Sequence, residues 1–162
     1  MITLGIDPGT ARLGYGVIAS EQDPSMVASG VIETPSSMTM PARLVILFDA
    51  VSELMARYQP TTVAVEQLFF ARNVTTAIVV GQARGVVLLA AGRMGVPVAE
   101  YTPTEVKQAV TGYGNADKRQ MQEMVRVVLG LADIPQPDDA ADALAVALCH
   151  AQSSAFLTRA RE

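Results

Sequence analysis

The chain has 162 residues, of which 50% are hydrophobic and 17% are charged. This composition excludes a disordered chain, and the length suits one compact α/β domain rather than two. The formal net charge of −4 argues weakly against a nucleic-acid partner, because phosphate binding depends on Lys and Arg. That indication disappears if five of the 16 acidic residues gather at one cation-binding site, since the other eleven nearly balance the 12 basic residues.

Short runs rich in Val, Ile and Gly open the chain and predict an antiparallel meander over residues 2–7, 14–19 and 28–34. An amphipathic helix is predicted over residues 41–58, where apolar side chains recur at the spacing of one helical face. A buried strand follows at 61–66.

Two acidic residues end predicted strands: Asp7 ends the first strand, and Glu66 ends the strand that follows the first helix. A crossover that contains a helix lets two strands lie parallel and adjacent. Their carboxyl ends then meet at one edge of the sheet, where open α/β sheets usually bind ligands. We therefore expect Asp7 to lie beside Glu66.

The rest of the chain predicts helices and one further strand. The expected elements are a helix at 75–92, a strand at 96–101, helices at 104–110 and 118–129, and a last helix from after Pro137 to about Gln152. Gln82 and Arg84 favour a buried helix at 75–92 over a membrane span. Together the elements predict a mixed five-stranded sheet with helices on both faces, in a single domain of residues 1–152 with a frayed tail at 153–162.

A second group of acidic residues stands at the start of the last helix. Asp139 and Asp142 are three residues apart and share one helical face, so both carboxylates can point the same way. Asp138 is interpreted as a helix cap, because an acid at a helix start binds free amide groups. Capping needs one acid and does not account for a same-face pair.

Four carboxylates gathered with few basic residues nearby would raise one another's pKa, and a cation must compensate. Hard divalent cations such as Mg²⁺ take oxygen ligands and are held by a few carboxylates. Two such ions, about 3.5–4 Å apart, can flank a phosphodiester, so that one activates water and the other stabilises the leaving oxygen. This chemistry requires acids and no nucleophilic side chain, and the sequence supplies those acids.

An ordered set of short motifs runs through the chain: GIDPG at 5–9 with GYG at 14–16, AVEQ at 64–67 with Phe69, GQARG at 81–85, VKQ at 106–108, ADK at 116–118 and DAADAL at 139–144. From residue 2 to about 151 this set resembles the RuvC crossover junction endodeoxyribonucleases, which are Holliday junction resolvases. The resemblance implies a ribonuclease H-like α/β fold and a nuclease that resolves four-way DNA junctions by paired symmetric nicks, in recombination and repair. It also implies RuvA and RuvB as partners, and two Mg²⁺ ions per active site with Mn²⁺ as a substitute.

The resemblance implies Asp7, Glu66, Asp139 and Asp142 as the catalytic acids and the metal ligands. An aromatic ring beside the scissile site would stack on a base or open a step at the junction, and of Phe69 and Phe70 the family position is Phe69. Basic side chains would contact phosphates, and glycines would let backbone amides approach them. These further candidates for DNA contact are Lys107, Lys118, Arg72, Arg84, Arg119, Gly112 and Gly114.

Three other functions remain open. The DPGT sequence at 7–10 also fits the phosphate-binding hairpin of actin-like ATPases and kinases, although that fold builds its site between two lobes and this chain has the length for one. A ribonuclease H-like nuclease that acts on RNA hybrids or single strands would use the same metals. A non-enzymatic DNA-binding module would not need the four acids.

The helix at 75–92 is apolar around much of its circumference, which is more than packing against a sheet requires. Gly81 and Gly85, one turn apart, would let another helix approach closely. Because a four-way junction has two equivalent strands and one chain has one set of acids, we expect a two-fold homodimer centred on this helix. The single cysteine and the absence of a signal-peptide pattern favour the cytoplasm.

Overall fold

The structure, a computed structural model, describes residues 1–21, 23–67 and 74–159, with side chains described as far as Ser154. Its elements are β1 (Ile2–Asp7), β2 (Arg12–Ser20), β3 (Pro24–Glu33), α1 (Met40–Tyr58), β4 (Thr62–Glu66), α2 (Val74–Met94), β5 (Val98–Tyr101), α3 (Pro103–Thr111), α4 (Lys118–Val128) and α5 (Asp138–Arg159). Each element predicted from the sequence is present at nearly the predicted position.

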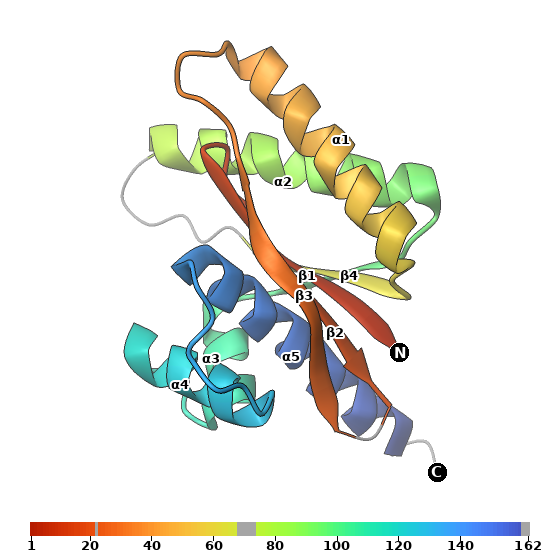
Figure 1. Cartoon of the computed structure of the whole chain (residues 1–162), viewed down its shortest axis with the longest axis vertical. Coiled ribbons are helices and arrows are strands. Elements are labelled where there is room, and N and C mark those ends of the chain that lie inside the picture. The colour runs from red at the N-terminus through yellow and green to blue at the C-terminus, as the bar shows by residue number, and fades with distance from the viewer. Residues whose placement is uncertain (22, 68–73, 160–162) are drawn as a thin grey trace.

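The strands form one mixed sheet in the order β3-β2-β1-β4-β5 (Figure 1). The first three strands pair antiparallel, as the meander predicted, whereas β4 runs parallel to both β1 and β5. The crossover through α1 therefore places β4 beside β1 at the centre of the sheet. The predicted mixed five-stranded sheet is confirmed.

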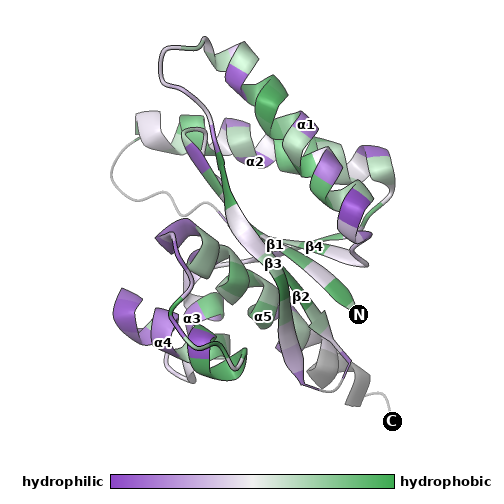
Figure 2. Cartoon of the chain, in the orientation of Figure 1, coloured by the Kyte–Doolittle hydropathy of each residue, from purple (hydrophilic) through white to green (hydrophobic). Residues whose placement is uncertain are grey.

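Helices cover both faces of this sheet, with α1 and α2 on one side and α3, α4 and α5 on the other (Figure 1). One core lies beneath α1 and α2 and includes Leu4, Ile6 and Val65. The other lies beneath α3–α5 and includes Ala64 and Leu144. After its hydrophilic first turn the ribbon of α5 is mainly hydrophobic, whereas α4 has strongly hydrophilic stretches (Figure 2).

Helix α5 packs unusually close to β1 and β2 because glycines face it. A Cβ atom at Gly5 would lie 2.2 Å from the carbonyl oxygen of Ala143, and one at Gly14 would lie 2.0 Å from the carbonyl oxygen of Asp139. Both distances are far below van der Waals contact, so any side chain at either position would push the helix away. The glycines thus fix the start of α5 against the end of β1.

Two helices differ from their predicted form. Helix α5 continues to Arg159, so residues 153–159, expected as a frayed tail, are helical. Helix α2 was expected to be buried, but only Ala83, Val87, Ala90 and Ala91 are, and its outer face is open to solvent. Among the described residues α2 is also the one helix long and apolar enough to cross a membrane, a test that considers length and composition alone.

Candidate active site

Asp7 and Glu66 lie next to each other at the carboxyl ends of β1 and β4. The parallel register pairs Ile6 with Val65, and each acid is the next residue of its strand. Ile6 points into the core under α1 and α2, so Asp7, one residue later, points to the opposite face, toward α5. The crossover argument therefore placed this pair correctly.

The first two turns of α5 bring Asp139 and Asp142 to the same place. Asp7 is paired across the sheet with Gly14, and Gly14 lies directly against the backbone of Asp139. Asp142 lies one turn further along the helix and lines a cavity of about 240 Å³ together with Glu66. Two strand ends and one helix start thus gather four acids.

The carboxyl groups perturb one another. Burial, together with the charges of Glu66, Asp142 and Asp139, raises the pKa of Asp7 from 3.8 to about 7. Burial and the charge of Asp142 raise the pKa of Glu66, and burial raises the pKa of Asp142 despite the neighbouring Lys118 ammonium. A cluster of this kind is costly when fully ionised, and a bound cation would relieve the cost.

We predict that Asp7→Asn stabilises the metal-free protein above neutral pH. Because the folded state binds the Asp7 proton more tightly than the unfolded state does, stability falls as pH rises from about 4 to about 7. Asn carries no charge and so does not incur this cost of burying an ionised carboxylate. At pH 8 in EDTA the variant should therefore be more stable than the wild type by about 1–2 kcal/mol, a value that allows for solvent screening. This difference corresponds to an increase of roughly 2–8 °C in Tm. Thermal denaturation at pH 4 and pH 8 measures this gap, and a variant less stable than the wild type at pH 8 would contradict the prediction.

Two cations engage acids of this cluster. Arg12 Nε lies 3.0 Å from Asp139 Oδ2, and Lys118 Nζ lies 3.4 Å from Asp142 Oδ2. As the described side chains lie, no three acidic, His or Cys residues are close enough together to hold one ion. A divalent ion bound by Asp139 and Asp142 would therefore compete with Arg12 and Lys118 for the carboxylate oxygens.

Asp138, interpreted from the sequence as a helix cap, points instead toward α4. Its Oδ2 atom lies 3.1 Å from Lys118 Nζ, and its Oδ1 atom accepts a hydrogen bond from Gln122 Nε2 at 3.1 Å. Lys118 lowers the pKa of this exposed carboxyl group, opposite to the direction found for Asp7, Glu66 and Asp142. Asp138 thus differs electrostatically from those three acids.

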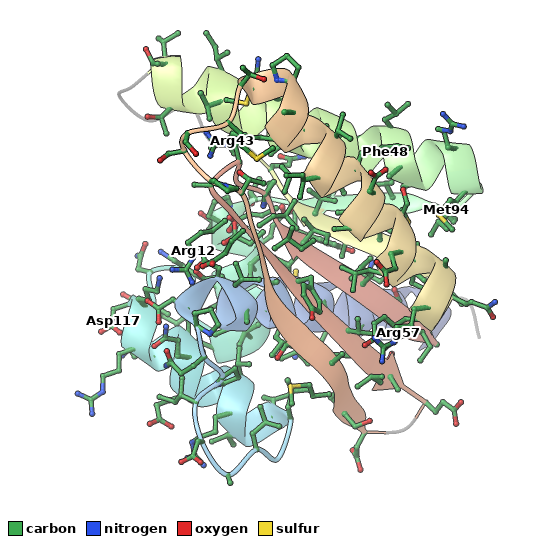
Figure 3. All side chains as sticks on the ribbon, turned by 45° about the horizontal axis from the view of Figure 1, so that its top comes forward. Arg12, Arg43, Phe48, Arg57, Met94 and Asp117 are labelled. Atoms are coloured by element: carbon green, nitrogen blue, oxygen red, sulfur yellow. The ribbon has the colours of Figure 1, made fainter. Side chains whose placement is uncertain are left out.

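Sequence reasoning missed two features that hold the site. Arg12 was not recognised, because its partner Asp139 comes from the far end of the chain. The Thr34 hydroxyl donates to the carbonyl of Thr10 at 2.5 Å and accepts from Arg43 Nε at 2.7 Å, which braces the turn after Asp7. Figure 3 shows Arg12 and Asp117 at the end of the molecule opposite Arg57 and Met94. The only sequence signal for the brace was the proximity of Thr10 to the GIDPG motif.

The candidate DNA-contact residues divide by position. Lys107 and Lys118 line the same cavity as Glu66 and Asp142, and Arg119 is exposed beside Lys118. Gly112 ends α3 with a positive φ of 73°, and its amide donates to the carbonyl of Gln108 at 2.9 Å, so this glycine has a structural role. Gly114 follows in the same connection between α3 and α4.

Arg84 lies away from this cluster. It is ion-paired with Glu100 of β5, whose side chain projects on the same face of the sheet as Val98, beneath α1 and α2. The structure therefore does not bring Arg84 together with the four acids. Phe69, Phe70 and Arg72 lie outside the described residues.

A comparison with protein-family models identifies the chain. The model for crossover junction endodeoxyribonuclease RuvC matches residues 3–150. The chain belongs to this family. A RuvC of Chloroflexus aggregans is 57% identical, with 98% of both chains covered, and one of Rubrobacter xylanophilus is 63% identical over 94% of this chain and 86% of the relative. The chain is thus an endodeoxyribonuclease, as the motifs predicted, rather than an actin-like ATPase or a binding module without activity.

Solved structures of the same family agree. Thermus thermophilus RuvC superposes with a TM-score of 0.91 at 41% identity, with 98% of both chains covered. The T. thermophilus RuvC in complex with a Holliday junction substrate superposes with a TM-score of 0.89 at 39% identity, with 96% of both chains covered. The predicted ribonuclease H-like fold is therefore confirmed.

Proposed function

We propose that this chain resolves four-way DNA junctions by paired nicks, through hydrolysis that depends on divalent metal ions held by Asp7, Glu66, Asp139 and Asp142. The observation that carries the proposal is the meeting of Asp7 and Glu66 at parallel strand ends, opposite the first two turns of α5. The Holliday junction bound to the T. thermophilus relative supports the choice of substrate.

The donor set suits a hard divalent cation. All four side chains offer carboxylate oxygens, and burial with mutual repulsion raises the pKa of Asp7, Glu66 and Asp142. These groups gain most from a cation, because it removes the repulsion that burial strengthens. We propose Mg²⁺ as that cation, two ions per site, with Mn²⁺ as a substitute.

When bound, the ions supply an activated water and stabilise the leaving oxygen of the scissile phosphodiester. The chain's own residues position the DNA. Lys107 and Lys118 line the cavity beside Glu66 and Asp142, so their ammonium groups can neutralise phosphate oxygens there. Pro103, Val106 and Met121 supply apolar parts of the cavity wall beside these charged groups.

Further parts of the proposal concern assembly and location. We infer a two-fold homodimer, and RuvA and RuvB as branch-migration partners on the basis of family membership. We infer that residues 1–152 act as one nuclease domain, because a single sheet links both cores. A cytoplasmic location fits the single, buried and unpaired Cys149.

The choice of substrate is tested by comparing the cleavage of different substrates. Purified protein with Mg²⁺ is incubated with a synthetic four-way junction, linear duplex, an RNA–DNA hybrid or ATP. We expect symmetric nicks in the junction and little consumption of the others. Preferred cleavage of the hybrid would favour a ribonuclease H-like nuclease with another substrate, and consumption of ATP would contradict the proposal.

We predict that Lys107→Ala and Lys118→Ala weaken junction binding and flatten its salt dependence. Each lost phosphate contact should reduce the slope of log K against log salt by about 0.9. Gel-shift titrations at several salt concentrations measure the slope. Arg57→Ala is the matched control. Arg57 lies at the end of the molecule opposite Asp117, which lines the same cavity as the two lysines (Figure 3). Equal slopes for all three variants would contradict the assignment.

A further inference from the structure

Lys118 and Gln122, one turn apart on α4, meet Asp138 and Asp142, one turn apart on α5. The ammonium of Lys118 lies between the two acids, 3.1 Å from Asp138 Oδ2 and 3.4 Å from Asp142 Oδ2. Gln122 Nε2 donates to the other oxygen of Asp138 at 3.1 Å and so fixes the orientation of that carboxylate. Lys118 therefore has two acidic partners, one of which is itself held in place.

The two partners stand in different surroundings. Asp142 lines the cavity that contains Glu66 and Lys107, whereas Asp138 lies at the outer edge with 53% of its side chain exposed. A cation in the cluster would draw on the oxygens of Asp142 and would repel the Lys118 ammonium from them. Asp138, outside the cavity, would keep its oxygens for Lys118.

We propose that Asp138 is a positioning residue, which retains Lys118 at the active site when Asp142 is engaged by a divalent ion. The proposal rests on the proposed function, in which Asp142 is a metal ligand. Without Asp138, Lys118 would have neither of its two acidic partners once Asp142 binds the ion, and its ammonium group would not be held in position to contact a phosphate. An ordered lysine loses less conformational entropy on contact with DNA than a free one does.

The expected effect is modest, because exposed ion pairs contribute little. Asp138→Asn should lower the rate of junction nicking by about three- to tenfold, which is far less than the loss expected for Asp142→Asn. Asp138→Glu keeps the charge and should restore part of the rate. Asp133→Asn, an equivalent change at an exposed acid in the loop before α5, should leave the rate unchanged.

A double-mutant cycle separates positioning from other roles. If Asp138 acts through Lys118, then Asp138→Asn should have no further effect on nicking in the Lys118→Ala background. Equal fold-losses in both backgrounds would overturn the proposal.

A second measurement reports on Lys118 without activity. The chain has only two lysines, at 107 and 118, so the side-chain ammonium signals in a ¹⁵N NMR spectrum are readily assigned with Lys107→Ala. Ion pairing protects such a signal from exchange with water. In the wild type we expect the Lys118 signal both in EDTA and with Mg²⁺, whereas Asp138→Asn should keep it in EDTA, through Asp142, and lose it with Mg²⁺.

Calorimetric titration with Ca²⁺ separates positioning from direct ligation. Asp138→Asn should bind Ca²⁺ within about twofold of the wild type, whereas Asp142→Asn should bind it at least about tenfold more weakly. Equal weakening would make Asp138 a metal ligand and overturn the proposal, as would loss of the wild-type Lys118 signal on addition of Mg²⁺. Junction cleavage by the wild type is scored separately, so failure of the proposed function would be distinguishable.

Discussion

Replacement of Glu66 by Gln is expected to abolish nicking of four-way junctions while binding survives. Glu66 and Asp142 line the same cavity, and burial together with the charge of Asp142 raises the pKa of Glu66. A bound cation would offset this repulsion, so Glu66→Gln removes a metal ligand from a place where a cation is strongly favoured. We expect a loss larger than the roughly 10- to 100-fold that removal of a residue behind a metal ligand costs. Removal of a negative charge should leave affinity for the phosphate backbone equal or higher.

The same result is expected for Asp7→Asn, Asp139→Asn and Asp142→Asn. Cleavage and gel-shift affinity are measured side by side. Asp138→Asn is the comparison variant, because it removes an acid from the same helix start outside the cavity and is expected to have only the modest effect of a positioning residue. Robust cleavage by Glu66→Gln would contradict the assignment of Glu66 as a metal ligand. A loss from Asp138→Asn as large as that from Asp142→Asn would overturn the choice of ligands.

The sequence was sufficient to place Asp7 beside Glu66. Both residues end short apolar strands, and the connection that leads from the antiparallel meander into β4 contains a helix, which is long enough for β4 to lie parallel to β1. This inference depends on local pattern and chain connectivity, so it needs no knowledge of side-chain packing. The GYG motif at 14–16 also has a structural reason, because the absence of a side chain at Gly14 lets the backbone of Asp139 approach the sheet closely.

Contacts between distant elements could not be predicted in the same way. The position of Asp138 suited a helix cap, yet its partners Lys118 and Gln122 lie on a different helix whose orientation is set by the core beneath α3–α5. Arg84 was a phosphate candidate by charge alone, and its ion pair with Glu100 depends on which face of β5 lies under α2. Charge patterns identify candidates, but tertiary packing decides their partners.

The outer face of α2 is the strongest indication of a second copy of the chain. Val74, Ile78 and Leu89 are 73%, 58% and 56% exposed, and the helical period places them on one stripe. Gly85 lies on the same stripe, and a Cβ there would have no neighbour within 4 Å. The buried residues Ala83, Val87, Ala90 and Ala91 occupy the opposite side. An apolar stripe with a glycine in it lets another helix approach closely, and two-fold symmetry would bring the same stripe from a partner.

We therefore predict that Ile78→Glu and Leu89→Glu each yield monomers that nick one strand of a junction without resolving it. A two-fold interface contains every substitution twice, so each variant would bury two like charges and raise the dimer dissociation constant by roughly 100-fold or more. Val127→Glu is the matched control, because Val127 is 56% exposed on α4, across the sheet from α2.

Sedimentation velocity at micromolar concentration gives the assembly state, and a junction labelled on both cleavable strands distinguishes single from paired nicks. A wild type that sediments as a monomer and still makes paired nicks would exclude the dimer, and dimeric Ile78→Glu and Leu89→Glu variants would move the interface away from α2.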